Sequence, residues 1–402
     1  MLKPILTVVM PTHNRASYAI SAINSILSFP DPDIELVVTD TSDNYQLRDA
    51  VSSIQDNRLK YSHVESPLSM TENYNLAMSK ATGLYVCLIG DDDTITADAI
   101  SVSRWAMDNN IEVVSPLVVA NYAWPDFKSR FFGNAHAGRL YIKKQFGDFK
   151  WCDSKLNLKK SLKKGSLGTE GLPKVYHSIV SKNLMNIIKD KSGDFFHGVS
   201  PDVSGAVGLA LVCDKYLEID YPLTLPGAAG NSNSGRSAMN THKGSLAEDS
   251  HTKRFKNLKW PNLLPQFTSV ETVWAQAAYS TLKALDADLL KEYNFLKLYA
   301  VCYLRHWDKR IHIDQSLAVY KNEYKLSPLS IYMSIFFEIS KEIVTLIFRY
   351  GKRLLTPTAA GGRGFVGNIQ DIHEAQLQLE HHVENNNQVL SEILRSSLTE
   401  RL

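Results

Sequence analysis

The sequence of 402 residues has few cysteines and no apolar run long enough to suggest export or a membrane span. Its four cysteines stand far apart without a Cys-x-x-Cys pair, which argues against a zinc knot and against a disulfide framework. The first apolar run is bracketed by Pro4 and Pro11, is too short for a signal peptide, and precedes no small-residue cleavage site. We therefore expect a cytoplasmic protein.

Two common nucleotide-binding sequences are also missing. There is no Gly-x-Gly-x-x-Gly fingerprint and no Walker sequence, which excludes a dinucleotide enzyme of the usual pattern and a P-loop protein. The composition, 44% hydrophobic and 21% charged, is that of ordinary globular proteins rather than disordered chains or integral membrane proteins. The length predicts one large domain with appendages, or two domains.

Charge is distributed unevenly although the net charge is only +2. Residues 1–100 hold thirteen acidic and six basic residues, whereas residues 120–200 hold fifteen basic and six acidic ones. The acidic part suggests that a cation is bound. The basic part suggests an anionic ligand or a membrane surface, or is merely a solvated face. We expect no nucleic-acid partner.

Strand-like and helix-like segments alternate over the first hundred residues, which predicts an α/β fold with a parallel sheet and crossover helices. In such sheets ligands bind beyond the carboxyl ends of the strands. The expected strands are residues 5–10, 34–39, 59–63 and 84–89, and the expected helices are residues 18–27, 47–54 and 70–80.

Three consecutive carboxylates, Asp91-Asp92-Asp93, follow the fourth expected strand. Their mutual repulsion calls for a counter-ion, and hard oxygen ligands suit Mg²⁺ or Mn²⁺ completed by phosphate oxygens. A solvated acidic turn that caps the helix expected at residues 94–107 is the alternative. Asp40 ends the second strand, where it either accepts hydrogen bonds from a base or ribose or forms a structural Asx turn.

Four blocks in order resemble family 2 glycosyltransferases with the GT-A fold, of the bacterial surface-polysaccharide type. They are VVMPTHNR, VVTDTSDN, Asn75-x-Ala77-x-x-x-Ala81-x-Gly83-x-Tyr85 and IGDDDTI. The resemblance implies that the nucleotide is contacted by Pro11, Thr12, Arg15 and Asp40, with Asn75 counted among the donor-binding residues. It further implies that Asp91 contacts the ribose and Asp92 binds the metal, with Asp93 assisting or supporting Asp92.

The same resemblance implies a general base at the start of a helix after the cleft-shaping segment. Ser200-Pro201-Asp202 fits this place because Pro201 suits a first helical turn, so Asp202 is the candidate base. An acid favoured there only by the helix dipole is the alternative. His242, after a Gly/Ser/Asn-rich stretch, is an additional candidate for the metal shell or simply a surface histidine.

These features predict an inverting glycosyltransferase that uses a nucleotide-diphosphate donor such as a UDP-sugar and a glycan or lipid-linked glycan acceptor. The metal would stabilise the leaving diphosphate, and a carboxylate would deprotonate the acceptor hydroxyl. A sugar-phosphate nucleotidyltransferase is one alternative, although the Gly-rich phosphate loop of those enzymes is missing. A non-catalytic scaffold that retains a nucleotide-sugar pocket is the other.

The second half of the chain is expected to be mainly helical. The apolar segment 331–348, followed by basic residues, predicts either a core helix or a helix on the inner face of the cytoplasmic membrane. A stripe of residues recurs at heptad spacing, which predicts a coiled coil that forms a homo-oligomer, or an amphipathic helix docked on the body. Its seam consists of Ile369, Ile372, Leu379, Val383, Leu390 and Ile393 with the polar residues Gln376 and Asn386. The expected divisions are a GT-A domain 1–245 (donor half 1–100, acceptor half 101–245), a helical region 246–355, a linker 356–367 and a coiled-coil-like helix 368–402.

Overall fold

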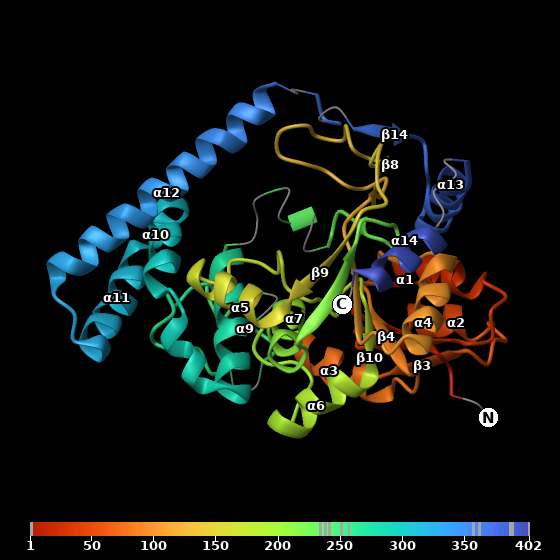
Figure 1. Ribbon diagram of the computed structural model, residues 1–402, viewed down its shortest axis with the longest axis horizontal. Helices are drawn as coiled ribbons and strands as arrows, with labels where there is room; N and C mark the ends of the chain where they lie inside the picture. The colour runs from red at the N-terminus through yellow and green to blue at the C-terminus, as the bar shows by residue number, and fades with distance from the viewer. Residues whose placement is uncertain are drawn as a thin grey trace.

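The fold is a layered α/β body that carries a helical extension (Figure 1). The computed structural model describes residues 3–232, 235–236, 239, 243–249, 252–255, 258–355, 358–360, 363–385 and 390–400, apart from the side chain of Lys352.

An eight-stranded sheet in the order β3-β2-β1-β4-β10-β6-β11-β9 forms the centre. The first four strands run parallel to one another, β10 lies antiparallel between β4 and β6, and β11 returns parallel to β6. The predicted α/β class with a mostly parallel sheet is thus confirmed. The strands are β1 Leu6–Thr12, β2 Ile34–Asp40, β3 Leu59–His63, β4 Tyr85–Leu88, β6 Val113–Pro116, β9 Phe149–Asp153, β10 Ile179–Ser181 and β11 Lys215–Ile219.

Helices cover both faces of this sheet, which explains why β1 is buried along its whole length. Val8 belongs to the core that includes α1, while its neighbour Val9 belongs to the core that includes α3. A capping box starts α3: Glu72 N donates to Ser69 Oγ at 3.3 Å, and Ser69 N donates to Glu72 Oε2 at 2.7 Å. These four helices are α1 Ala16–Leu27, α2 Gln46–Val51, α3 Met70–Lys80 and α4 Ala97–Asp108.

Two small sheets close the carboxyl end of the central sheet. One pairs β5 with β12, and the other has the order β13-β7-β8-β14. They bring residues near 227 over the segment that follows β4. β14 lies within the segment 356–367, which the sequence assigned to a linker. The strands are β5 Thr94–Ile95, β7 Ala120–Ala123, β8 Arg139–Ile142, β12 Thr224–Leu225, β13 Gly227–Ala228 and β14 Gly364–Val366.

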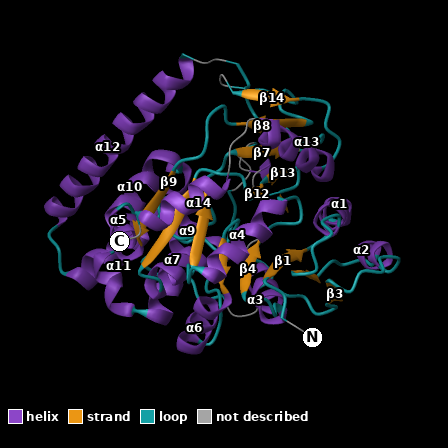
Figure 2. Cartoon of the chain, turned by 45° about the vertical axis from the view of Figure 1, so that its right-hand side comes forward, coloured by secondary structure: helices purple, strands orange, loops and turns teal. Residues whose placement is uncertain are grey.

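A second core holds the helical region against α7 (Figure 2). α9 packs on α7, and α10 packs on the long helix α12. Within the described part of the chain, no helix is both long and apolar enough to cross a bilayer. The elements are α5 Ser154–Lys163, α6 Lys182–Ser192, α7 Pro201–Val212, α9 Val270–Leu285, η1 Ala287–Glu292, α10 Phe295–Arg305, η2 Trp307–Lys309, α11 Arg310–Tyr324 and α12 Pro328–Leu354.

The last described segment forms two helices, α13 Ile372–Asn385 and α14 Leu390–Thr399. Ile369, Ile372, Gln376 and Leu379, which the sequence assigned to a coiled-coil seam, are buried, and α13 packs on α1. The stripe therefore packs against α1 of the same chain, which offers an apolar surface. This is the arrangement expected for an amphipathic helix docked on the body. Asn386, a predicted seam residue, lies outside the described residues.

Candidate functional site

The cluster Asp91-Asp92-Asp93 follows β4 at the carboxyl ends of the parallel strands, and all three side chains are buried. β1 ends beside it at Thr12, and α1 begins immediately after Arg15. Both of these predicted residues contact the cluster. This end of the sheet is where ligands of open α/β sheets bind.

Asp91 is held by both of these residues. Thr12 Oγ1 donates a 2.6 Å hydrogen bond to Asp91 Oδ2, and Arg15 Nε lies 3.2 Å from Asp91 Oδ1. Burial raises the pKa of Asp91, and the charge of Arg15 opposes this effect. Conversely, burial works against the charged form of Arg15, but Asp91 and Asp92 outweigh it and raise the pKa of Arg15. Pro11 is buried within β1 opposite Thr39 of β2.

Asp92 is the least compensated of the three carboxylates. Its Oδ2 accepts a 3.0 Å hydrogen bond from Ala229 N and lies 3.0 Å from Arg15 Nη2. Among the described residues, none donates a hydrogen bond to its Oδ1. Burial raises the pKa of Asp92 to about 7, with Asp93 and Asp91 adding repulsion that Arg15 only partly offsets.

Both carboxylate oxygens of Asp93 instead accept hydrogen bonds, and the donors come from three segments of the chain. Its Oδ2 accepts from Gly90 N at 2.7 Å and from Tyr176 Oη at 2.8 Å, and it lies 3.2 Å from His177 Nε2. Its Oδ1 accepts from Gly227 N at 2.7 Å. Although burial alone would raise the pKa of Asp93, the charge and hydrogen bond of His177 lower it. Asp93 therefore joins the strand ends together, and its oxygens are already engaged.

Asp40 does not reach the surface of the site. Its side chain is fully buried, its Oδ1 accepts from Ser42 N at 2.8 Å, and its Oδ2 accepts from Tyr61 Oη at 2.8 Å. His63 Nδ1 lies 3.4 Å from the same Oδ2. This is the Asx turn that the sequence left open. Protein donors bind both oxygens of this buried side chain, and the direct contact between Asp40 and the base stays a prediction.

Two polar residues that face outward at this edge are Asn14, a candidate because it follows the first strand, and Asp43, which the sequence analysis did not select. Asn14 has a φ of 56° and donates from Nδ2 to Asp43 Oδ2 at 2.7 Å. Arg254 Nη2 also lies 3.3 Å from Asp43 Oδ2. The signal that the sequence offers for Asn14 is its place directly after the first expected strand, where polar residues are candidates for ligand binding.

Asn75 was predicted to bind the donor, but its amide is used by the backbone before α7. Its Oδ1 accepts from Phe195 N at 3.1 Å and from Phe196 N at 2.9 Å, and its Nδ2 donates to Phe196 O at 3.0 Å. Each polar atom of the amide thus has a backbone partner. Asn75 fixes the segment that leads to Asp202 rather than facing the nucleotide.

Asp202 lies in the first turn of α7, which has Pro201 at its start, and it accepts a short hydrogen bond from Ser200 Oγ. Burial raises the pKa of Tyr74, and the charges of Asp202 and Asp91 raise it further. Both carboxylates therefore act on the one Tyr74 hydroxyl. Asp202 and Asp91 thus both lie near Tyr74, although they are more than 100 residues apart in the sequence.

The fit of a divalent metal depends on Asp92. The described residues contain no group of three or more His, Cys, Asp and Glu side chains arranged to hold a metal ion. Mg²⁺ commonly needs only one or two carboxylates together with substrate phosphates. The unpaired Oδ1 of Asp92, in a carboxylate with a raised pKa, is suited to this role, whereas Asp93 is not. His242 lies outside the described residues.

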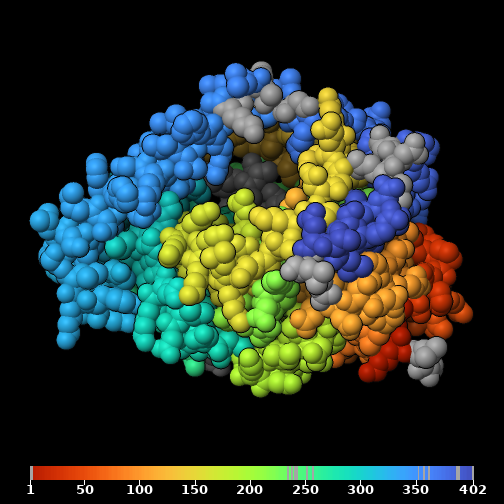
Figure 3. All heavy atoms as spheres, viewed as in Figure 1, coloured from red at the N-terminus to blue at the C-terminus, as the bar shows by residue number. Residues whose placement is uncertain are grey.

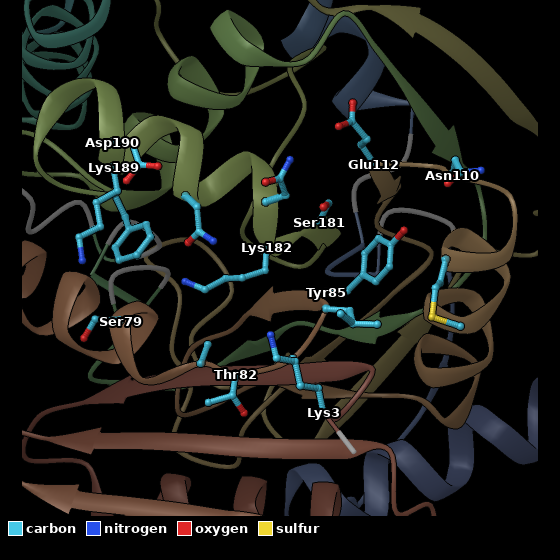
Figure 4. A pocket seen from close by; sticks show the side chains of 17 residues that line it. Lys3, Ser79, Thr82, Tyr85, Asn110, Glu112, Ser181, Lys182, Lys189 and Asp190 are labelled. Atoms are coloured by element: carbon cyan, nitrogen blue, oxygen red, sulfur yellow. The ribbon is translucent and has the colours of Figure 1, made fainter. Parts of the chain in front are cut away.

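Two further cavities lie away from the acidic cluster. One of about 970 Å³ opens at the amino ends of β1 and β4, and Figure 4 shows Lys3, Tyr85 and Lys182 around it. Burial lowers the pKa of Lys182 to about 8. The other, of about 1060 Å³, lies between α5, α9, α10 and α12. Cations, acids and an aromatic ring line it, including Lys160, Lys164, Glu170, Trp274 and Arg349.

Residues 7–158 match the model of glycosyl transferase family 2. This segment contains Thr12, Arg15 and the acidic cluster, but it ends before Tyr176, Asp202 and Gly227.

Several curated proteins are similar to the first part of the chain. A putative colanic acid biosynthesis glycosyl transferase, WcaA of Escherichia coli K12, is 33% identical over 101 residues, which cover 25% of this chain and 36% of that protein. A GalNAc(5)-diNAcBac-PP-undecaprenol beta-1,3-glucosyltransferase of Campylobacter jejuni is 31% identical over 104 residues, covering 24% of this chain and 33% of that protein. The matches span 22% to 40% of the lengths of the curated relatives.

Among solved structures, S. aureus TarS 1-349 in complex with UDP-GlcNAc aligns with 81% of this chain and 92% of its own, at 14% identity and a TM-score of 0.44.

Proposed function

We propose that the chain transfers a sugar from a nucleotide-diphosphate donor, a UDP-sugar, to a glycan or lipid-linked glycan acceptor, because residues 7–158 match the model of glycosyl transferase family 2. The main support for this function is that Arg15 forms ion pairs with Asp91 and Asp92 at the carboxyl ends of the strands. Arg15 neutralises only part of the negative charge of the acidic cluster. The remaining carboxylate charge suits a metal ion that in turn binds a diphosphate. We propose surface polysaccharide synthesis as its role and the cytoplasm as its location.

On the donor side, the roles that we propose for individual residues differ from those implied by the resemblance alone. Asp92 would hold Mg²⁺ or Mn²⁺ through its unpaired Oδ1, and this metal would neutralise charge on the leaving diphosphate. Thr12 and Arg15 orient Asp91, which remains the candidate ribose contact. Asp93 keeps the cluster in place. Asn14 and Asp43 are exposed polar groups available to the base.

On the acceptor side, Asp202 is the proposed general base. It would accept the proton of the attacking hydroxyl while the sugar leaves the diphosphate on its other face, so the anomeric centre would be inverted. Its place near Tyr74, together with the acidic cluster, supports this role. The cavity that contains Trp274, Lys160 and Arg349 supports an acceptor that carries sugar rings and negative charge.

Two variants test the two halves of the proposal separately. Asp92→Ala should lose Mn²⁺-dependent binding of UDP, measured by titration calorimetry, because the remaining carboxylates would face an uncompensated diphosphate. Asp202→Asn should keep UDP affinity and lose transfer from labelled nucleotide sugars, because it removes a base without touching the donor. Glu218→Gln, a partly buried carboxylate on β11, is the matched control.

Two results would oppose the proposal. Unchanged Mn²⁺-dependent affinity in a folded Asp92→Ala variant would remove Asp92 from the metal site. Normal turnover of Asp202→Asn would remove the base. If the unaltered chain bound UDP but neither transferred nor hydrolysed any donor in the panel, a non-catalytic scaffold would be the better description.

A further inference from the structure

The helix α12 presents an apolar face to the outside of the molecule. It runs along one edge, away from the central sheet, as the long blue helix at the upper left of Figures 1 and 3. Phe336 is 66% exposed, Phe348 is 75% exposed and Leu354 is 79% exposed. The other large hydrophobic side chains of α12 that are exposed are Leu329, Tyr332, Met333, Phe337, Ile343, Val344, Ile347 and Tyr350.

These side chains form one continuous stripe. At 100° per residue they fall within a sector of about 160°, and the sequence places no charged residue inside that sector. At about 1.5 Å per residue, the 27 residues of α12 give a stripe about 40 Å long. The largest apolar surface patch of a typical monomer is a few hundred Å², so an uninterrupted stripe of this length indicates an interaction surface.

Two acidic residues of α12, Glu338 and Glu342, face the body and are neutralised there. Glu342 lies 2.9 Å from Lys297 Nζ and 2.7 Å from Arg305 Nη2, while Glu338 contacts Lys297 and Lys341. A surface helix of an ordinary globular protein shows the reverse arrangement, with its apolar residues inward. These ion pairs, together with Ile331 and Ile335 in the second core, hold α12 in an orientation that leaves its broad apolar side exposed.

Cations flank the stripe. Lys341 Nζ lies 4.1 Å from the ring centroid of Phe337, and at 100° per residue Lys341 falls just outside the edge of the apolar sector, whereas Arg349 falls on the opposite side, where it lines the cavity between α5, α9, α10 and α12. Beside α12, Trp307 is 62% exposed, with the Arg310 guanidinium 5.8 Å from its ring centroid. Apolar residues with Trp at one edge and Lys and Arg along the flanks are typical of helices that lie in a membrane interface.

We propose that α12 lies flat on a bilayer that contains anionic lipids, with its apolar stripe among the acyl chains and its flanking cations at the headgroups. A second copy of the chain fits less well, because two stripes brought face to face would set like-charged flanks against each other. Anionic headgroups complement the same flanks. The proposal rests on α12 alone and does not depend on the reaction proposed above.

The test is co-sedimentation of the full chain with vesicles of phosphatidylcholine alone or with phosphatidylglycerol added. Binding should be stronger with phosphatidylglycerol and should weaken as salt is raised. The double variant Phe336→Ser with Phe348→Ser should reduce partitioning at least ~tenfold, because two large apolar side chains no longer enter the bilayer. Since both side chains are exposed, the variant should fold normally.

The matched control replaces two exposed apolar residues outside α12, Val118→Ser with Leu377→Ser, and should bind vesicles like the unaltered chain. Equal vesicle binding by the α12 double variant and the unaltered chain would overturn the proposal. So would absence of binding by the unaltered chain, including the case in which light scattering shows a dimer that the α12 variant loses. UDP binding and transfer to a soluble acceptor, measured on the same preparations, separate failure of this inference from failure of the proposed function.

Discussion

Replacement of Asn75 distinguishes a donor-binding residue from one that positions the catalytic segment. Asn75→Ala removes three hydrogen bonds to the backbone of Phe195 and Phe196. At about 1 kcal/mol net for each bond, the free energy of unfolding should fall by about 3 kcal/mol. Urea unfolding followed by circular dichroism measures this loss.

The functional consequence should fall on turnover rather than on the donor. The segment fixed by Asn75 leads into α7, and a displacement of Asp202 by about 1 Å is expected to reduce kcat on the order of 100-fold. The dissociation constant of UDP should stay within about twofold, because no donor contact is lost. Asn183→Ala, on an exposed part of α6, controls for removal of an amide. A tenfold weaker UDP affinity with unchanged kcat would refute this reasoning and restore Asn75 to the nucleotide.

Three further predictions concern stability and assembly. Although burial alone would raise the pKa of Glu271, His306 lowers it to about 2 from a usual 4.5, so its stabilisation is complete above pH 4.5 and is lost towards pH 2. This amounts to about 3 kcal/mol, and urea unfolding of Glu271→Gln should lack that part of the acid dependence. Asp93→Asn should destabilise the fold by about 2 kcal/mol, whereas Asp92→Asn, which relieves repulsion, should leave the unfolding midpoint unchanged or higher. Leu379→Ser should lower the melting temperature without changing the mass in light scattering, and a smaller oligomer would support the coiled-coil interpretation.

The first four strands were predictable because their signals are local. β1, β2 and β4 are short runs of mostly apolar residues, β3 alternates between apolar and polar residues up to Ser62, and the helices between them repeat with helical spacing. The position of the acidic cluster followed from the same pattern, because carboxyl ends of parallel strands share one edge. The four blocks in their order then pointed to the family.

The roles of individual polar residues were less predictable. Asp40 and Asn75 occupy the expected places, but their partners, Tyr61 in the next strand and the Phe196 backbone, could not be inferred from the motifs. Tyr176 and Gly227 carried no motif at all, and their importance depends on tertiary pairing with Asp93. Local sequence patterns predict where a site lies. The role of each polar residue in it depends on hydrogen bonds to residues that are distant in the sequence.

The apolar stripe of α12 shows a related limit. Its periodicity predicted a helix with one apolar face, and both a core helix and a membrane-surface helix fitted it. Which face turned inward was decided in part by Lys297 and Arg305, more than thirty residues earlier in the chain. Only the folded chain reveals that these two cations select the acidic side.

The donors around Asp93 also bear on how the site assembles during folding. They come from residue 90, from residues 176–177 and from residue 227, so a single carboxylate closes loops of more than 80 and more than 130 residues. Contacts of such sequence separation form late, because the entropy of closing long loops is lost before the contact is gained. A nascent chain that has reached residue 158 contains the whole family-matching segment but lacks these partners. The geometry of the acidic cluster is therefore complete only when the strand at Gly227 has docked, so folding delays the appearance of the proposed metal site.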